Sequence, residues 1–177
     1  MTKQTLQDLA LALGLLGLAL IPSTALAQVG LTNAVNPPEQ KEGLWSIHRL
    51  SIDNPGNNRS ESTSTICRSH AYDQYVLSLA KGVKGCTTVS ESFQGGKYSV
   101  ELHCVETGTV VENKQTATYQ GDTSVHSETH ATYTPALNGI SEMTIIMDQK
   151  YVGSCPAGAQ PGDITHADGR VTHSWKR

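Results

Sequence analysis

Glycine-bearing turns recur along much of this sequence and separate segments in which apolar and polar residues alternate. Gly95-Gly96, Gly121-Asp122 and Asn138-Gly139 are dipeptides typical of tight hairpin turns. Segments joined by such turns fold back on one another as consecutive antiparallel strands. We therefore predict strands over residues 44–52, 60–67, 86–94, 97–106, 109–120, 123–134 and 140–152.

One stretch, residues 69–81, departs from this alternation and repeats its apolar residues with a helical period. Ser69 is a suitable N-cap, Asp73 lies in the first turn, and Gly82 is suited to end the helix. A helix this short is marginal in water, so its apolar stripe must pack against the strands. The stripe consists of Tyr72, Tyr75, Val76 and Leu79.

The predicted fold class is mainly β with a minor α contribution. We expect a curved antiparallel sheet or open barrel of about seven strands, with one packed α-helix and two disulfides. The β-rich domain covers residues 43–155, after a flexible lead-in over residues 28–42. Residues 156–177 contain little apolar sequence and are expected to form a loose tail.

Residues 1–27 have the pattern of a cleaved secretory signal peptide. Lys3 is followed by a Leu/Ala-rich run and by Ala25-Leu26-Ala27, a small-x-small cleavage signal, so we expect cleavage after Ala27. No second apolar run of membrane-spanning length follows. These features predict an exported protein of the periplasm without a membrane span.

Four cysteines follow this segment, and an even number in an exported chain favours two disulfides. A two-residue turn at Gly95-Gly96 would place Cys104 opposite Thr87, so that Cys86 faces the other side of the sheet. This register disfavours a bond between Cys86 and Cys104. Of the two remaining connectivities, we expect Cys67–Cys86 with Cys104–Cys155.

Charge and motifs exclude several functional classes. With a formal net charge of −3, the chain lacks the excess of basic residues that nucleic-acid binding requires. The sequence also contains no nucleophile elbow, phosphate loop, H-E-x-x-H or dinucleotide fingerprint. We therefore expect no enzymatic activity, no cofactor and no nucleic-acid partner.

His126, Glu128 and His130 alternate along one predicted strand and would share a face, as metal ligands should. Four residues of strand span about 13 Å, which is too far for both histidines to bind one ion. A two-residue turn would place Ala117, Gln115 and Asn113 opposite them, and none is a usual zinc ligand. We expect a solvated or structural row. One conflict remains, because a simple register across Asn138-Gly139 puts His130 on the face of Met147, which is expected to be core. Either a bulge changes the parity there, or a histidine is partly buried.

A series of short motifs resembles domain of unknown function family 3617, a family of small exported proteins of Gram-negative bacteria. The resemblance covers about residues 40–163 and implies a periplasmic location and paired cysteines, but no catalytic residues. The motifs are Gly43-Leu44-Trp45, Cys67 before a helix, Gly85-Cys86, the segment from Tyr98 to Cys104, Tyr119-Gln120-Gly121-Asp122, Gly153-Ser154-Cys155-Pro156 and Pro161-Gly162-Asp163.

The functional hypothesis is a non-enzymatic periplasmic binding or interaction module. Its ligand would be a small apolar molecule, or its partner an envelope component, because a curved sheet closed by a helix can leave an apolar cavity. The alternative is a metal-dependent hydrolase or metal-handling protein that uses the histidine row. The candidate ligand-lining residues are Tyr72, Tyr75, Val76, Leu79, Tyr98, Val100, Leu102, Met143, Ile145 and Met147.

Overall fold

A computed structural model describes residue 35 and residues 37–175 of the chain. These residues belong to the second of the two units into which the chain divides, Asn33–Arg177. The predicted signal peptide lies outside the described residues. The elements are β1 (Gly43–Asn54), β2 (Asn58–Arg68), α1 (His70–Lys81), β3 (Cys86–Gln94), β4 (Lys97–Glu106), β5 (Thr109–Gln120), β6 (Ser124–Leu137), β7 (Ile140–Gly153), β8 (Asp163–His166) and β9 (Val171–His173).

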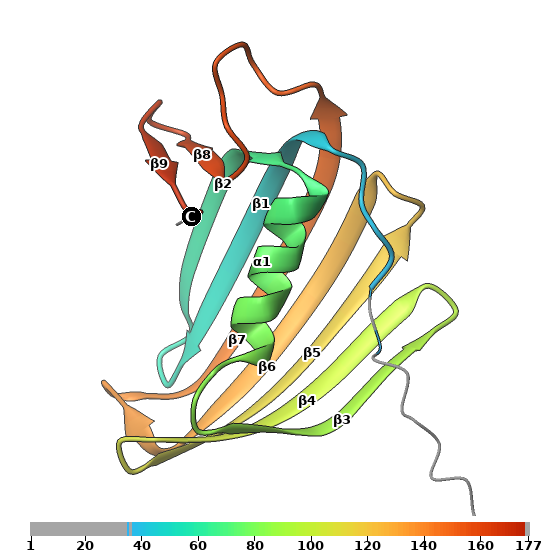
Figure 1. Cartoon of the computed structure of the whole chain (residues 1–177). Coiled ribbons are helices and arrows are strands. Elements are labelled where there is room, and N and C mark those ends of the chain that lie inside the picture. Colours follow the sequence, from blue (N-terminus) through green and yellow to red (C-terminus); the bar gives the residue numbers. More distant parts are fainter. Residues whose placement is uncertain (1–34, 36, 176–177) are drawn as a thin grey trace, which may run out of the picture. The chain divides into compact units, whose positions relative to one another are not determined.

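The strands form one antiparallel sheet in the order β3-β4-β5-β6-β7-β1-β2-β8-β9. Strands β3 to β7 are neighbours in the order of the chain. The hairpin of β1 and β2 joins the sheet where β1 pairs with β7. The sheet curves and does not close, and α1 crosses its concave face (Figure 1). The predicted fold class is therefore confirmed, with nine strands in place of about seven.

The additional strands lie in the segment that was expected to be a loose tail. This expectation is wrong for the described residues, because β8 pairs with β2 and extends the sheet. The backbone N–H of Gly162 donates to the carbonyl of Cys67, and the ring of Trp175 packs against Tyr72 and Tyr75. Gly162 permits this packing, because a Cβ at that position would lie 2.8 Å from the Cβ of Trp175. The tail therefore covers one side of α1.

The concave face of the sheet carries the core. Trp45 is fully buried there and packs with Ile66 of β2, Ala117 of β5 and Val125 of β6. Strand register places the candidate lining residues of two strands on this same face, since Val100, Gln115, Thr129 and Ile145 are successive cross-strand neighbours. These residues are Tyr98, Val100 and Leu102 of β4 and Met143, Ile145 and Met147 of β7. Alternation therefore directs them toward the helix-facing side of the sheet.

The helix begins and ends where the sequence predicts. The Ser69 hydroxyl accepts a hydrogen bond from the N–H of Tyr72, Asp73 lies in the first turn, and Gly82 is the C-cap. Only part of the expected stripe is covered. Tyr72 is buried, whereas Leu79, two turns further along the same face, is 54% exposed. The backbone of α1 stands away from the strands, so side chains and open space lie between them.

The expected cysteine pairing is wrong. The disulfides join Cys67 to Cys155 and Cys86 to Cys104. The turn at Gly95-Gly96 has the expected two residues, but the register shifts by one between Thr88 and Ser90. This irregularity moves Cys86 directly opposite Cys104 and onto the same face of the sheet. A disulfide therefore lies near each end of α1. Cys67 precedes the helix by a few residues, and Cys86 follows it by a few residues.

A second irregularity resolves the position of His130. The register between β6 and β7 shifts between Thr132 and Leu137, so His130 lies opposite Thr144 and not Met147. The shift changes the parity of the pairing and places His130 on the convex face, where it is exposed. The bulge, and not a buried histidine, is therefore the correct alternative.

Candidate functional site

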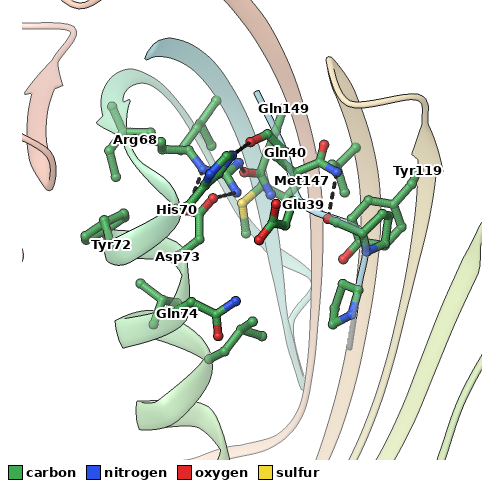
Figure 2. Close-up of a pocket in the computed structure, with 17 residues that line it drawn as sticks. Glu39, Gln40, Arg68, His70, Tyr72, Asp73, Gln74, Tyr119, Met147 and Gln149 are labelled. Atoms are coloured by element: carbon green, nitrogen blue, oxygen red, sulfur yellow. Dashed lines mark hydrogen bonds and ion pairs between the residues drawn. The ribbon is translucent and has the colours of Figure 1, made fainter. Parts of the chain in front are cut away.

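A pocket of about 330 Å³ lies between α1 and the concave face of the sheet (Figure 2). Its apolar walls come from strands on one side and from the helix on the other. Alternate residues of a strand point to the same face, so β1, β2, β6 and β7 each contribute side chains to one surface. The apolar lining consists of Ile47, Ile66, Val125 and Met147 of the sheet and Tyr72, Val76 and Leu77 of the helix.

One end of this pocket is polar and is built around Arg68. Its Nε and Nη2 atoms donate to the two carboxylate oxygens of Asp73 at 2.9 and 3.0 Å. Its Nη1 atom donates to Oε1 of Gln149 at 3.3 Å, and the guanidinium lies over the ring of Trp45. The Arg68 and Asp73 side chains are 14% and 20% exposed. This bidentate pair neutralises its own charge and connects the end of β2 to the first turn of α1.

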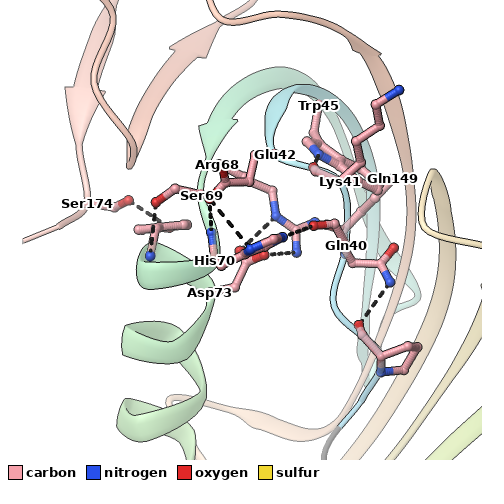
Figure 3. A network of polar contacts seen from close by, with 12 residues as sticks. Gln40, Lys41, Glu42, Trp45, Arg68, Ser69, His70, Asp73, Gln149 and Ser174 are labelled. Atoms are coloured by element: carbon pink, nitrogen blue, oxygen red, sulfur yellow. Dashed lines mark hydrogen bonds and ion pairs between the residues drawn. The ribbon is translucent and has the colours of Figure 1, made fainter.

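The segment that precedes β1 crosses the same end of the pocket (Figure 3). The carbonyl of Gln40 lies 3.0 Å from Nε2 of His70, and the Glu42 carboxylate accepts the backbone N–H of His70. The N–H of Lys41 donates to the carbonyl of Asp122, and Gln40 is 4% exposed. Residues 37–42 are therefore packed against the domain, contrary to the flexible lead-in that was expected there. The sequence carries no signal for this beyond the conformational restriction of Pro37-Pro38.

Gln40 also contributes an unusual polar atom. Its Nε2 donates to the carbonyl of Pro38 at 3.0 Å, whereas its buried Oε1 has no hydrogen-bond partner among the described residues. An unpaired buried acceptor costs about 1–3 kcal/mol, which is a large share of a domain's stability.

Tyr119 of β5 separates this pocket from a second one. Its ring packs edge-on against Phe93, and its hydroxyl makes no hydrogen bond to another described residue. Burial raises the pKa of Tyr119, an effect that the charge of Arg68 opposes and that of Asp73 reinforces. The hydroxyl therefore stays protonated at neutral pH and can donate a hydrogen bond into the pocket that it lines.

The second pocket, of about 450 Å³, lies beside the first along the helix. It shares Pro37, Val76, Leu77 and Tyr119 with the first pocket, so the two spaces adjoin. Its floor comes from β4 and β5, where the Tyr98 hydroxyl donates to Glu91 at 2.8 Å. Burial and this carboxylate raise the pKa of Tyr98. The remaining apolar lining consists of Ala80, Val100, Leu102 and Ala117.

Six of the ten candidate ligand-lining residues line one or both pockets. Tyr72 and Met147 line the first, Val76 lines both, and Tyr98, Val100 and Leu102 line the second. Four residues line neither pocket. Tyr75 packs on Trp175, Leu79 is exposed, and Met143 and Ile145 lie further along the concave face of β7. The sequence did not indicate Arg68, Asp73, Gln40 or Tyr119 as pocket residues.

The row of His126, Glu128 and His130 lies on the convex face, and none of the three lines either pocket. The turn before β6 has three residues, so these side chains face Thr118, Thr116 and Lys114, not the residues expected from a two-residue turn. Each histidine pairs with one carboxylate of β7, and His126 also pairs with Glu128 of its own strand. His126 lies 2.7 Å from Asp148 and 3.2 Å from Glu128, and His130 lies 2.5 Å from Glu142.

The hydrogen bond to Asp148, followed by that to Glu128, raises the pKa of His126. The tail histidines have separate partners, His166 with Thr172 and His173 with Asp163. Within the described residues, no group of three or more His, Cys, Asp or Glu side chains is placed to hold a metal ion.

Comparison with protein families matches residues 40–155 to a family described as proteins of unknown function, DUF3617. The chain belongs to this family. Its boundaries contain β1 to β7 and all four cysteines, while β8 and β9 lie beyond them. The family carries no assigned activity.

No curated protein matches the sequence. Among solved structures, the S-type phycobiliprotein lyase CPES from Guillardia theta matches with a TM-score of 0.35 and 10% identity, over 64% of this chain and 89% of the other. This similarity is too low to carry an argument about function. Across the part of the chain that the structure describes, no helix is long and apolar enough to span a membrane.

Proposed function

We propose that this DUF3617 protein is a non-enzymatic binding module of the periplasm, which holds a small amphipathic molecule between α1 and the concave face of the sheet. The observation that carries the proposal is the 330 Å³ pocket, which adjoins a second space under the same helix. Protein interiors rarely leave voids larger than a water molecule, and small-molecule pockets measure about 300–1,000 Å³. The size of the space supports a ligand site.

The lining supports binding and not catalysis. The two charged groups at the polar end, Arg68 and Asp73, satisfy one another in a bidentate pair. His70 also lines the pocket, but its Nε2 atom is engaged by the carbonyl of Gln40. The histidine–carboxylate pairs of β6 and β7, which could support acid–base chemistry, lie on the opposite face of the sheet.

The disulfides support a location outside the cytoplasm. Cys67–Cys155 and Cys86–Cys104 use every cysteine of the chain. Structural disulfides are typical of secreted and periplasmic proteins and rare in reducing compartments. Together with the signal-peptide pattern of residues 1–27, they favour export to the periplasm.

Calorimetric titration with 1-decanol tests the proposed site. We expect saturable binding to the oxidised protein, and loss of binding in Leu77→Trp, because the larger ring occupies space that Leu77 borders in both pockets. Leu79→Trp is the matched control on the same helix, since Leu79 lines neither pocket and is 54% exposed.

Val76→Trp provides a second blocking variant at a more exposed position, should Leu77→Trp disturb folding. The proposal is wrong if the wild-type protein does not bind decanol. It is also wrong if both blocking variants bind decanol as the wild type does.

A further inference from the structure

We propose that the ligand of this site carries an uncharged hydroxyl-bearing head group, held by Arg68 at the polar end of the first pocket and by Tyr119 at its border with the second, and that the site discriminates against free carboxylates. This inference rests on the proposed function and specifies its ligand class. It depends on the charges and the unused hydrogen-bonding atoms of the first pocket.

The charge of the polar end is unfavourable for an anion. Among the described residues that line the first pocket, Arg68 is the one Lys or Arg side chain, and both carboxylate oxygens of Asp73 already neutralise it. Glu39, an exposed side chain, also lines the pocket and forms no ion pair with another described residue. His70 is engaged by Gln40 and Glu42 and is left out of this sum. The charges of Arg68, Asp73 and Glu39 then add up to one negative charge. A ligand carboxylate would have to leave water without a free cation to receive it.

Unused hydrogen-bonding capacity in the first pocket suits a hydroxyl group. Arg68 has five N–H donors, of which three serve Asp73 and Gln149. The Tyr119 hydroxyl lines the pocket, has no partner among the described residues and is not fully enclosed by protein atoms. A ligand hydroxyl both donates and accepts, so it can accept from the Tyr119 hydroxyl, or accept from a free N–H of Arg68 while it donates to the Tyr119 oxygen.

The apolar part of the ligand has a direction to follow. The second pocket begins at Val76, Leu77 and Tyr119, where the first one ends. It continues along the underside of α1 over Val100 and Leu102 of β4. With the head group beside Tyr119, a flexible apolar chain can therefore pack against the walls of the first or the second pocket.

Competition between two ligands of equal chain length tests the inference. At pH 8, 1-decanol should bind the oxidised protein at least about tenfold more tightly than decanoate, which would have to bury an unpaired charge. Tyr119→Phe should weaken decanol binding about fivefold, the effect of one lost hydrogen bond. Glu39→Gln should raise the affinity for decanoate more than that for decanol, because it removes the uncompensated charge.

The outcomes separate the two proposals. If decanoate binds as tightly as decanol, or more tightly, the head-group inference is wrong while the binding site stands. An unchanged decanol affinity in Tyr119→Phe would also overturn it. If neither ligand binds, the proposed function fails, and the inference fails with it.

Discussion

Removal of the Cys67–Cys155 disulfide should destabilise the protein more than removal of Cys86–Cys104. The first bond joins residues 88 positions apart, from the end of β2 to the segment after β7, whereas the second spans 18 residues within one hairpin. The chain-entropy model gives a stabilisation that grows with the logarithm of the loop length. It assigns about 4.6 kcal/mol to the longer loop and about 3.2 kcal/mol to the shorter one.

Packing should widen this difference. Cys67 is 3% exposed, so its truncation also removes buried sulfur contacts, while Cys86 and Cys104 are only half-buried. The double variants Cys67→Ala/Cys155→Ala and Cys86→Ala/Cys104→Ala can be compared with the oxidised wild type by equilibrium urea unfolding. We expect the first variant to lose at least about 1.4 kcal/mol more than the second. Equal losses, or the reverse order, would refute the argument from loop length.

Three further predictions follow from single residues. Ser69→Ala should lower the free energy of unfolding by about 1 kcal/mol, because it removes the N-cap of α1, and a loss near zero in urea unfolding would contradict this. The raised pKa of His126 means that its pairs with Asp148 and Glu128 stabilise the fold below the usual histidine pKa and lose this effect as the pH rises through the raised value. The difference in stability between the wild type and His126→Asn should therefore shrink with rising pH; a constant difference would contradict the assignment. Tyr98 should ionise at a higher pH than an ordinary tyrosine, since burial and its hydrogen bond to Glu91 raise its pKa. In ultraviolet titration, Tyr98→Phe should lose a step at high pH that the wild type shows; loss of a step at the ordinary tyrosine pKa would contradict this.

The regular part of the fold was predictable because each element has a local physical cause. Glycines at Gly95-Gly96 and Asn138-Gly139 mark turns that are typical of hairpins, and the alternation between them identifies the face that is buried. Ser69 and Gly82 bound the helix through hydrogen bonds to its own backbone. These causes act within a few residues, so they can be recognised in the sequence.

Departures from ideal register were not predictable in the same way. The shift between Thr88 and Ser90 carries no glycine, and yet it determines that Cys86 faces Cys104. A one-residue shift reverses every side chain beyond it, so a small irregularity changed the disulfide connectivity. The parity change near His130 has the same origin, although the conflict with Met147 made a bulge one of two alternatives that the sequence left open.

The pocket was predictable in place but not in chemistry. Its apolar residues follow from the periodicity of the strands and the helix. Its polar end depends on long-range neighbours, since Arg68 meets Gln149 and Gln40 meets His70 only after the sheet has formed. The tail likewise has no strong strand pattern of its own. Its strands are stabilised by pairing with the edge of β2 and by the packing of Trp175 on Tyr72.

The methyl groups of two methionines provide the most direct measurement of the central claim, that a ligand binds between α1 and the sheet. Besides Met1, the chain contains Met143 and Met147, which lie on the same face of β7. Met147 lines the first pocket, whereas Met143 lines neither pocket. In NMR spectra of protein labelled with ¹³C at the methionine methyls, addition of 1-decanol should shift the Met147 signal saturably and leave the Met143 signal in place. No saturable shift at Met147, or a shift at Met143 alone, would contradict the proposed site.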